Sequence, residues 1–221
     1  MPKQKGTNPV YSLAEELMSS ISHGVGTLLA VAALVVGVVT AAIYSDAWCV
    51  VSMAVYGATL VVLYSMSTIY HGLKPNKGKR VFRVLDHCAV FFLIAGTYTP
   101  LTLVSLRGVL GWVMFGIVWG AAVLGIVLNA VSLHRFKVFS MICYIAMGWV
   151  IVFAFKPLME VMQTGGIVLL ITGGVAYTIG AVLYGIGKKV KYMHSVFHFF
   201  VLAGSILHYF CILLYVVPVI R

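Results

Sequence analysis

Acidic residues are scarce in this sequence: only five of its 221 residues are Asp or Glu, and 9% carry any charge. So little charge excludes an ordinary soluble domain, in which about a quarter of the residues are charged. Apolar residues predominate instead: 62% of the chain is hydrophobic, and its mean hydropathy is +1.07. The composition predicts an integral protein of the cell (plasma or inner) membrane, with membrane lipids as its partners.

Closely spaced cysteines are also absent. The four cysteines fall singly on four different apolar runs, which excludes a zinc knuckle and gives no sign of a disulfide framework. A continuous basic surface is lacking too, although 15 Lys and Arg give a net charge of +10. These residues form short clusters between apolar runs, so we expect them to set membrane topology and not to bind nucleic acid. No cleaved signal peptide is expected, because the first apolar run is too long.

Seven apolar runs are each about long enough for the roughly 20 residues that cross a hydrocarbon core. Residues 1–11 are polar, so we expect a flexible N-terminal segment there. A Ser-x-x-Glu capping box at Ser12 predicts a short amphipathic helix along the membrane surface. Residues 12–221 are expected to form one all-α domain, a seven-transmembrane helix bundle. The predicted spans lie near 24–44, 48–70, 84–104, 109–131, 138–155, 166–186 and 193–217.

The basic residues between these runs are distributed unequally across the predicted membrane. Twelve lie on one side and three on the other, and Lys and Arg concentrate in cytoplasmic loops. The N-terminus is therefore expected in the cytoplasm and the C-terminus outside, opposite to the G-protein-coupled receptors. The twelve are Lys3, Lys5, Lys74, Lys77, Lys79, Arg80, Arg83, Arg135, Lys137, Lys188, Lys189 and Lys191, and the three are Arg107, Lys156 and Arg221.

Histidines gather at one end of this predicted bundle. His194 and His198, four residues apart, stack on one helical face one turn apart, a spacing that lets two imidazoles reach one metal ion. His71 closes the second run at the same depth. A polar group without a partner costs several kcal/mol in hydrocarbon, so residues placed there usually have a function. We expect these three histidines to hold a catalytic zinc, with its fourth position left to water.

Two further residues at this depth suit hydrolytic chemistry. Asp86, one turn into the third run, is placed to hydrogen-bond the metal-bound water, and Ser67 lies one turn before the ligand of the second run. Simpler interpretations stay open: Asp86 can pair with Arg83, Ser67 can bond its own helix, and the histidine pair can bond backbone or lipid headgroups. His87 points about 100° away from Asp86, which suits packing or support of the ligands. His208, about 21 Å further along the last run, is expected to be an ordinary bundle residue.

Four motifs extend over nearly the whole chain, from about residue 12 to residue 217. They are Glu16-x-x-Ser19-x-x-Ser22-His23, Ser67-x-x-x-His71, Leu85-Asp86-His87 with Gly96-Thr-Tyr-Thr-Pro100, and His194-x-x-x-His198. Together they resemble the motif set of the hemolysin III proteins, bacterial members of the progestin and adipoQ receptor family. That family is similar in turn to alkaline ceramidases, through a shared pattern of one Ser, one Asp and three His. The resemblance implies zinc on the three histidines, Asp86 beside the zinc water and Ser67 near the reacting carbonyl.

Glu16, Ser19 and His23 lie on one helical stripe in the first of these motifs. The resemblance implies that this stripe supports the zinc ligands. The family usually has Asn where this chain has Ser19. The departure bears on the supporting role of the stripe and not on the metal site.

Several functions are compatible with the sequence. The first is a zinc-dependent hydrolase of a lipid amide or ester, in which Asp86 takes a proton from water and Ser67 helps to stabilise the oxyanion. The second is a sensor or receptor for a lipid or protein partner, with a structural zinc whose coordination shell is full. A pore needs a continuous polar stripe, whereas polarity here is concentrated at one end. A bis-histidine haem is a fourth option, but the His-x-x-x-His spacing favours a compact ion.

Overall fold

The computed structural model describes residues 11–187 and 189–217, and all regular structure within these ranges is helical. Six helical stretches of the described chain are long and apolar enough to cross a membrane. Residues 1–10 of the segment predicted to be flexible lie outside the described residues. The elements are α1 (Leu13–Tyr44), α2 (Ala47–Gly72), α3 (Lys77–Pro100), η1 (Leu101–Ser105), α4 (Val109–Trp149), η2 (Val150–Ala154), α5 (Phe155–Val161), α6 (Thr164–Ile186) and α7 (Met193–Tyr215).

Helix α1 begins at the predicted capping box. The Ser12 hydroxyl accepts from the Glu15 amide at 3.3 Å, and the Glu15 carboxylate accepts from the Ser12 amide at 2.9 Å. From there α1 runs without a break for 32 residues, about 48 Å. The predicted surface helix is therefore not a separate element but the first turns of α1. Its polar residues Glu15, Ser19 and Ser22 are buried against neighbouring helices and do not face solvent.

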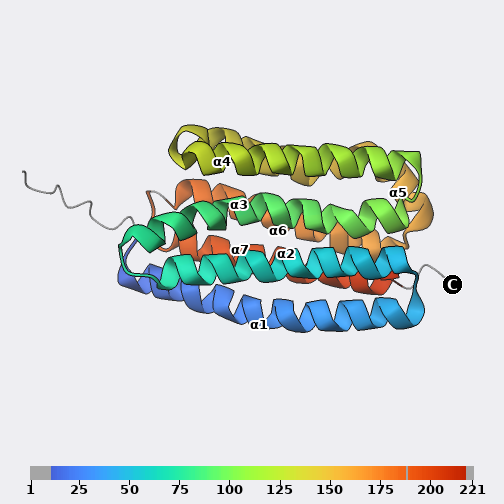
Figure 1. Cartoon of the computed structure of the whole chain (residues 1–221), viewed down its shortest axis with the longest axis horizontal. Coiled ribbons are helices and arrows are strands. Elements are labelled where there is room, and N and C mark those ends of the chain that lie inside the picture. Colours follow the sequence, from blue (N-terminus) through green and yellow to red (C-terminus); the bar gives the residue numbers. More distant parts are fainter. Residues whose placement is uncertain (1–10, 188, 218–221) are drawn as a thin grey trace, which may run out of the picture.

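Helix α4 contains a reversal of the chain at Ser132. The backbone of Ser132 is extended, with φ −161° and ψ 92°. Asn129 and Ser140 lie on either side of it, and a straight helix would separate two residues eleven apart by about 16 Å. Instead, the Ser140 hydroxyl donates to the Asn129 side-chain oxygen at 2.7 Å. The predicted runs 109–131 and 138–155 therefore lie side by side, with most of both inside α4 (Figure 1).

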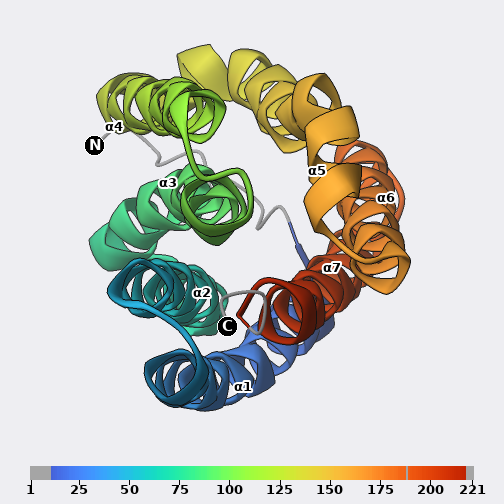
Figure 2. The same ribbon diagram turned by 90° about the vertical axis from the view of Figure 1, so that its right-hand side faces the viewer.

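The long helices run alongside one another and form a ring when the bundle is viewed along its length (Figure 2). Consecutive helices contact each other, and α7 also contacts α1, so the last helix closes the ring against the first. The start of α1, the end of α2 and the starts of α3 and α7 meet at one end of the bundle (Figure 1). The histidine-rich parts of the sequence therefore come together at that end.

A close contact fixes the spacing of α1 and α2 near this end. Gly26 of α1 faces the ring of Tyr64, and a Cβ atom at Gly26 would lie only 2.6 Å from that ring. The Tyr64 ring in turn meets His23 edge-on, with centroids 5.0 Å apart. The absence of a side chain at Gly26 therefore lets α1 bring His23 toward the middle of the bundle.

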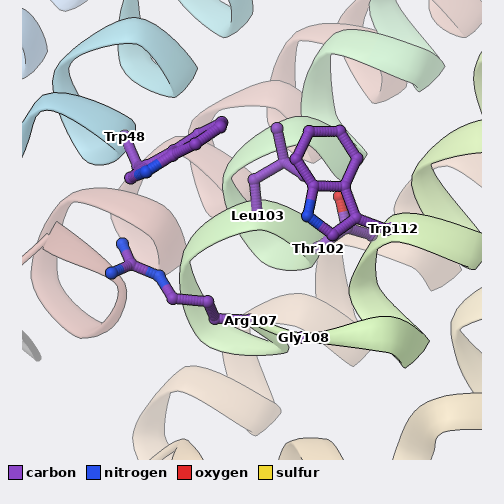
Figure 3. A pocket seen from close by; sticks show the side chains of 6 residues that line it. All are labelled: Trp48, Thr102, Leu103, Arg107, Gly108 and Trp112. Atoms are coloured by element: carbon purple, nitrogen blue, oxygen red, sulfur yellow. The ribbon is translucent and has the colours of Figure 1, made fainter.

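The opposite end of the bundle has a small hollow of about 140 Å³. Figure 3 shows Trp48 and Trp112 at its rim, above the Arg107 side chain. The two indole rings meet edge-to-face with centroids 5.7 Å apart. Arg107 donates to the Asp46 carboxylate at 2.6 Å, and Asp46 caps α2 by accepting from the Cys49 amide at 3.0 Å. Tryptophans with an exposed ion pair are typical of a membrane–water boundary.

Candidate metal centre

Three buried imidazoles converge at the histidine-rich end of the bundle. His71 comes from the last turn of α2, and His194 and His198 come from the first turns of α7. The Nε2 atom of His194 lies 3.5 Å from Nε2 of His71 and 3.2 Å from Nε2 of His198. One ligand atom from each residue lies within 4.8 Å of the others, so the three residues can hold a metal ion. The structure thus brings together the residues that spacing and depth had singled out.

The nitrogen separations fit tetrahedral coordination. Zinc–imidazole bonds of about 2.0–2.1 Å place neighbouring ligand nitrogens about 3.3–3.4 Å apart in a tetrahedron. The two Nε2 separations given above, 3.2 and 3.5 Å, bracket this value. The Nε2 lone pairs of the three neutral imidazoles face one another inside an apolar bundle. Buried acceptors without a partner are costly, so a cation or a proton between these nitrogens would satisfy them. Imidazole also binds copper, iron and nickel, so the three residues define a metal site and not a particular ion.

A carboxylate fixes the orientation of His71. Glu16 Oε2 accepts a hydrogen bond from His71 Nδ1 at 2.7 Å, which leaves the Nε2 lone pair directed at the other two histidines. Lys79 donates to the second oxygen of Glu16 at 2.8 Å and to the carbonyl of Leu73 at 2.9 Å. A carboxylate behind a ligating histidine is typical of protein metal sites. From the sequence, Lys79 was predicted only to help set the membrane topology. No local spacing connects it with Glu16, which lies 63 positions earlier in the chain.

The other two residues of the predicted α1 stripe contact α7. His198 donates from Nδ1 to His23 Nε2 at 2.8 Å, which again leaves Nε2 directed at the centre of the site. The hydroxyls of Ser19 and Ser195 lie 3.3 Å apart, and Ser195 also donates to the carbonyl of Glu15 at 3.1 Å. Ser195 follows His194 directly and was not predicted. The Ser19 side chain, which departs from the Asn expected from the resemblance, still contacts the α7 segment that carries His194 and His198.

Asp86 and Ser67 line a cavity of about 300 Å³ that also reaches His194 and His198. Ser67 Oγ is buried and has no hydrogen-bond partner among the described residues, so it does not bond its own helix. Within the described residues Asp86 forms no ion pair with Arg83, and the basic nitrogen nearest to its carboxylate is Nδ1 of His87, at 3.6 Å. Both polar groups therefore face a space in which a bound molecule can meet them.

His87 and the aromatic residues frame the site without reaching the three Nε2 atoms. His87 donates from Nδ1 to the Arg83 carbonyl at 2.8 Å and accepts from the Tyr184 hydroxyl at 3.2 Å. The Tyr184 ring lies 5.7 Å from that of His194, and the Tyr11 ring stacks on His194 with centroids 4.2 Å apart. Burial is the main cause that raises the pKa of the Tyr11 hydroxyl, so Tyr11 is neutral at physiological pH. Aromatic residues are common in membrane helices, so Tyr184 had no recognisable signal, and Tyr11 lies at the end of the segment that was expected to be flexible.

The walls of the cavity beyond the site are mostly apolar. They include Leu63, Leu93, Ile94 and Val201 from three helices. His208 lies at the far end, where its Nε2 donates to the Leu170 carbonyl at 3.0 Å. A pocket of about 300 Å³ is at the lower end of the range for small-molecule sites, and its apolar walls suit an acyl chain.

The chain resembles known proteins along nearly its whole length. A family model described as haemolysin-III related matches residues 11–209. The chain is 40% identical over 215 residues to Hemolysin-3 of Bacillus cereus, which covers 97% of this chain and 98% of the relative. It is 40% identical over 210 residues to the Hemolysin-3 homolog of Bacillus subtilis (strain 168), with 95% and 98% covered. Human monocyte to macrophage differentiation factor is 26% identical over 175 residues, 76% of this chain and 71% of that protein. No solved structure matches the chain.

Proposed function

Because this chain belongs to the haemolysin-III related family of multi-pass membrane proteins, we propose that it is a zinc-dependent hydrolase of a lipid amide or ester. Support comes from three groups: the three converging imidazoles, of which His194 and His198 line an apolar cavity, and the Asp86 carboxylate and unpartnered Ser67 hydroxyl that line the same cavity. Buried hydroxyl groups are normally hydrogen-bonded. If Ser67 only packed against its neighbours, its lack of a partner beside the histidines would have no explanation.

The proposed topology has seven spans in one domain, with the N-terminus in the cytoplasm and the C-terminus outside. The reversal at Ser132 supports the count, since the chain on either side of it then crosses the membrane separately. The unequal distribution of Lys and Arg supports the orientation. In this topology the metal site lies near the cytoplasmic leaflet of the cell membrane.

Zinc is the ion that suits the site best. His71, His194 and His198 would hold it as three neutral imidazole ligands, the number that catalytic zinc sites typically take from the protein. When bound, zinc supplies a Lewis acid that lowers the pKa of water to about 7 and polarises a carbonyl. The Glu16 carboxylate keeps His71 in the required tautomer, and His23 does the same for His198.

Asp86, Ser67 and the apolar walls of the cavity have separate roles in the proposed hydrolysis. Asp86 accepts the proton of the attacking water and returns it to the leaving nitrogen or oxygen. Ser67 donates its hydroxyl proton in a hydrogen bond to the carbonyl oxygen as negative charge develops there. The apolar walls of Leu93, Ile94 and Val201 hold the acyl chain and exclude water from it.

Zinc content and lipid turnover, measured on the same Asp86→Asn preparation, test this mechanism. The amide keeps the shape of the side chain but cannot accept the proton, so turnover should fall about 10²–10⁴-fold while zinc stays bound. His198→Ala should lose zinc and turnover together, and His208→Ala should keep its zinc. Zinc-loaded Asp86→Asn that turns over lipid at the wild-type rate would rule out Asp86 as the base. A wild-type protein that holds zinc but hydrolyses no lipid amide or ester would favour a sensor with a structural metal.

A further inference from the structure

The cavity that reaches His194 and His198 has a basic mouth. Arg83 lines it from α3, and His134 and Lys137 line it from the part of α4 that follows the reversal. Arg83 precedes Asp86 by three residues, so it lies about 4.5 Å nearer the end of the bundle along the axis of α3. A molecule that places its reacting carbonyl beside Asp86 therefore brings its next few atoms to Arg83.

Carboxylates are scarce at this mouth among the described residues. Asp86 is the sole carboxylate among the described residues that line the cavity. Glu15, Glu16 and Asp46 are bonded to other partners, and Glu160 lies in α5, at the opposite end of the bundle (Figure 1). The Arg83 guanidinium forms no ion pair with a carboxylate of the described chain. A bound metal cation would make the mouth more positive still.

Such a mouth discriminates between lipid headgroups by charge. A guanidinium binds a carboxylate or a phosphate through two parallel hydrogen bonds, and an ammonium group adds a second positive charge. A neutral alcohol offers only a single, weaker hydrogen bond. Charge interactions are also stronger beside low-dielectric walls than in water.

We propose that the cavity selects acyl lipids that carry an anionic group, a carboxylate or a phosphate, on the leaving side of the scissile amide or ester. Arg83 binds this group, Lys137 adds positive charge beside it, and the acyl chain extends along the apolar walls toward His208. The inference rests on the proposed function for the position of the reacting bond. An N-acyl amino acid has the required arrangement, whereas an N-acyl ethanolamine has the same chain and amide without the charge.

Equilibrium binding to purified protein in neutral phosphatidylcholine nanodiscs tests the selection without turnover. Radiolabelled hexadecanoate and hexadecyl phosphate should each bind at least about tenfold more tightly than hexadecanol, after subtraction of binding to empty nanodiscs. Arg83→Gln and Lys137→Gln should each reduce this preference several-fold. Arg135→Gln is the matched control, because Arg135 lies in the same segment but stacks on Phe136 outside the lining of the cavity.

The metal site is the competing location for the anion, so the binding is repeated on His198→Ala protein and on chelator-treated wild type. The proposal is supported if the metal-free samples still bind the anions more tightly than the alcohol and if Arg83→Gln reduces this preference. A preference that disappears with the metal and ignores Arg83→Gln would overturn it, as would equal binding of the alcohol and the two anions, or an equal loss in Arg135→Gln. Failure to hydrolyse any lipid would overturn the proposed function instead, because binding is measured separately from turnover. If hydrolysis does occur, N-palmitoylglycine should have a higher kcat/KM than N-palmitoylethanolamine, and Arg83→Gln should reduce the difference.

Discussion

His71 depends on residues from two other helices for its orientation. Glu16 accepts its Nδ1 proton, and Lys79 holds the same carboxylate from α3. We expect Glu16→Gln to lower metal affinity about 10–100-fold, because the amide is a weaker acceptor than the carboxylate behind a ligand. Competition with a chromogenic chelator measures this affinity. Glu15→Gln is the control: that carboxylate bonds the Ser12 and Tyr192 amides, so its loss should leave metal affinity unchanged. Equal affinity in wild type and Glu16→Gln would contradict a role for this contact.

The ion pair at the opposite end of the bundle should make stability depend on pH. Burial opposes ionisation of Asp46, but the Cys49 amide and the Arg107 guanidinium outweigh it and hold the pKa of Asp46 below its usual value. A lowered carboxyl pKa stabilises the fold above the unfolded-state value of about 3.9, and this contribution disappears as pH falls through the folded-state pKa. Asp46→Asn, which can still cap α2, should therefore be less stable at pH 6 by about 0.2–1 kcal/mol, as for an exposed pair.

Thermal unfolding in detergent between pH 3 and pH 6 measures the Asp46 contribution. The difference between wild type and Asp46→Asn should shrink toward the acid end of this range. Asn has no charge at any of these pH values, so a difference that stays constant would assign the effect to the cap and not to the ion pair.

Residues of the candidate metal site could be predicted from the sequence where they have a local spacing or belong to a known motif. The His-x-x-x-His pair and the stripe of Glu16, Ser19 and His23 are of this kind. Lys79 and Ser195 were missed, since their contacts join residues 63 and 176 positions apart and neither type of residue is unusual at a helix end.

At the level of elements, the sequence predicted the apolar runs well and the beginning of α1 badly. The runs coincide with helices because every backbone polar group must be satisfied within the hydrocarbon. Polar residues after Ser12 suggested a helix that faces water. In the structure Glu15 and Ser19 are buried against α7, which is a long-range contact that periodicity alone does not distinguish from exposure.

The contact between α1 and α2 gives a test at the scale of helix packing. We expect Gly26→Ala to destabilise the protein by about 1–3 kcal/mol, because the added methyl group would lie 2.6 Å from the Tyr64 ring and force the helices apart. Gly116→Ala is the matched control, since nothing lies within 4 Å of a Cβ atom there. In that open position alanine should be neutral or stabilising by up to about 1 kcal/mol. Thermal unfolding compares the two variants, and equal stability would mean that Tyr64 can move away at little cost.

For the whole molecule, the unequal distribution of basic residues gives a direct test of topology. A periplasmic-type reporter fused after Arg221 should be active outside the cytoplasm, and the same reporter in the connection 74–80 should be inactive. A cytoplasmic reporter should show the reverse at both positions. An active external reporter in the connection 74–80 would place the metal site at the outer leaflet and contradict the proposed orientation.

The metal ligands also impose an order on the synthesis of this protein. His71 and His194 are 123 residues apart in the chain, an interval that a ribosome needs about 6–25 s to translate. During this time α2 is already made, while both ligands of α7 are still missing. The candidate site therefore cannot hold an ion until α7 has entered the membrane beside α1. A message that stops before α7 would yield a chain without the complete set of three histidines, so any metal ion would have to bind after α7 is made.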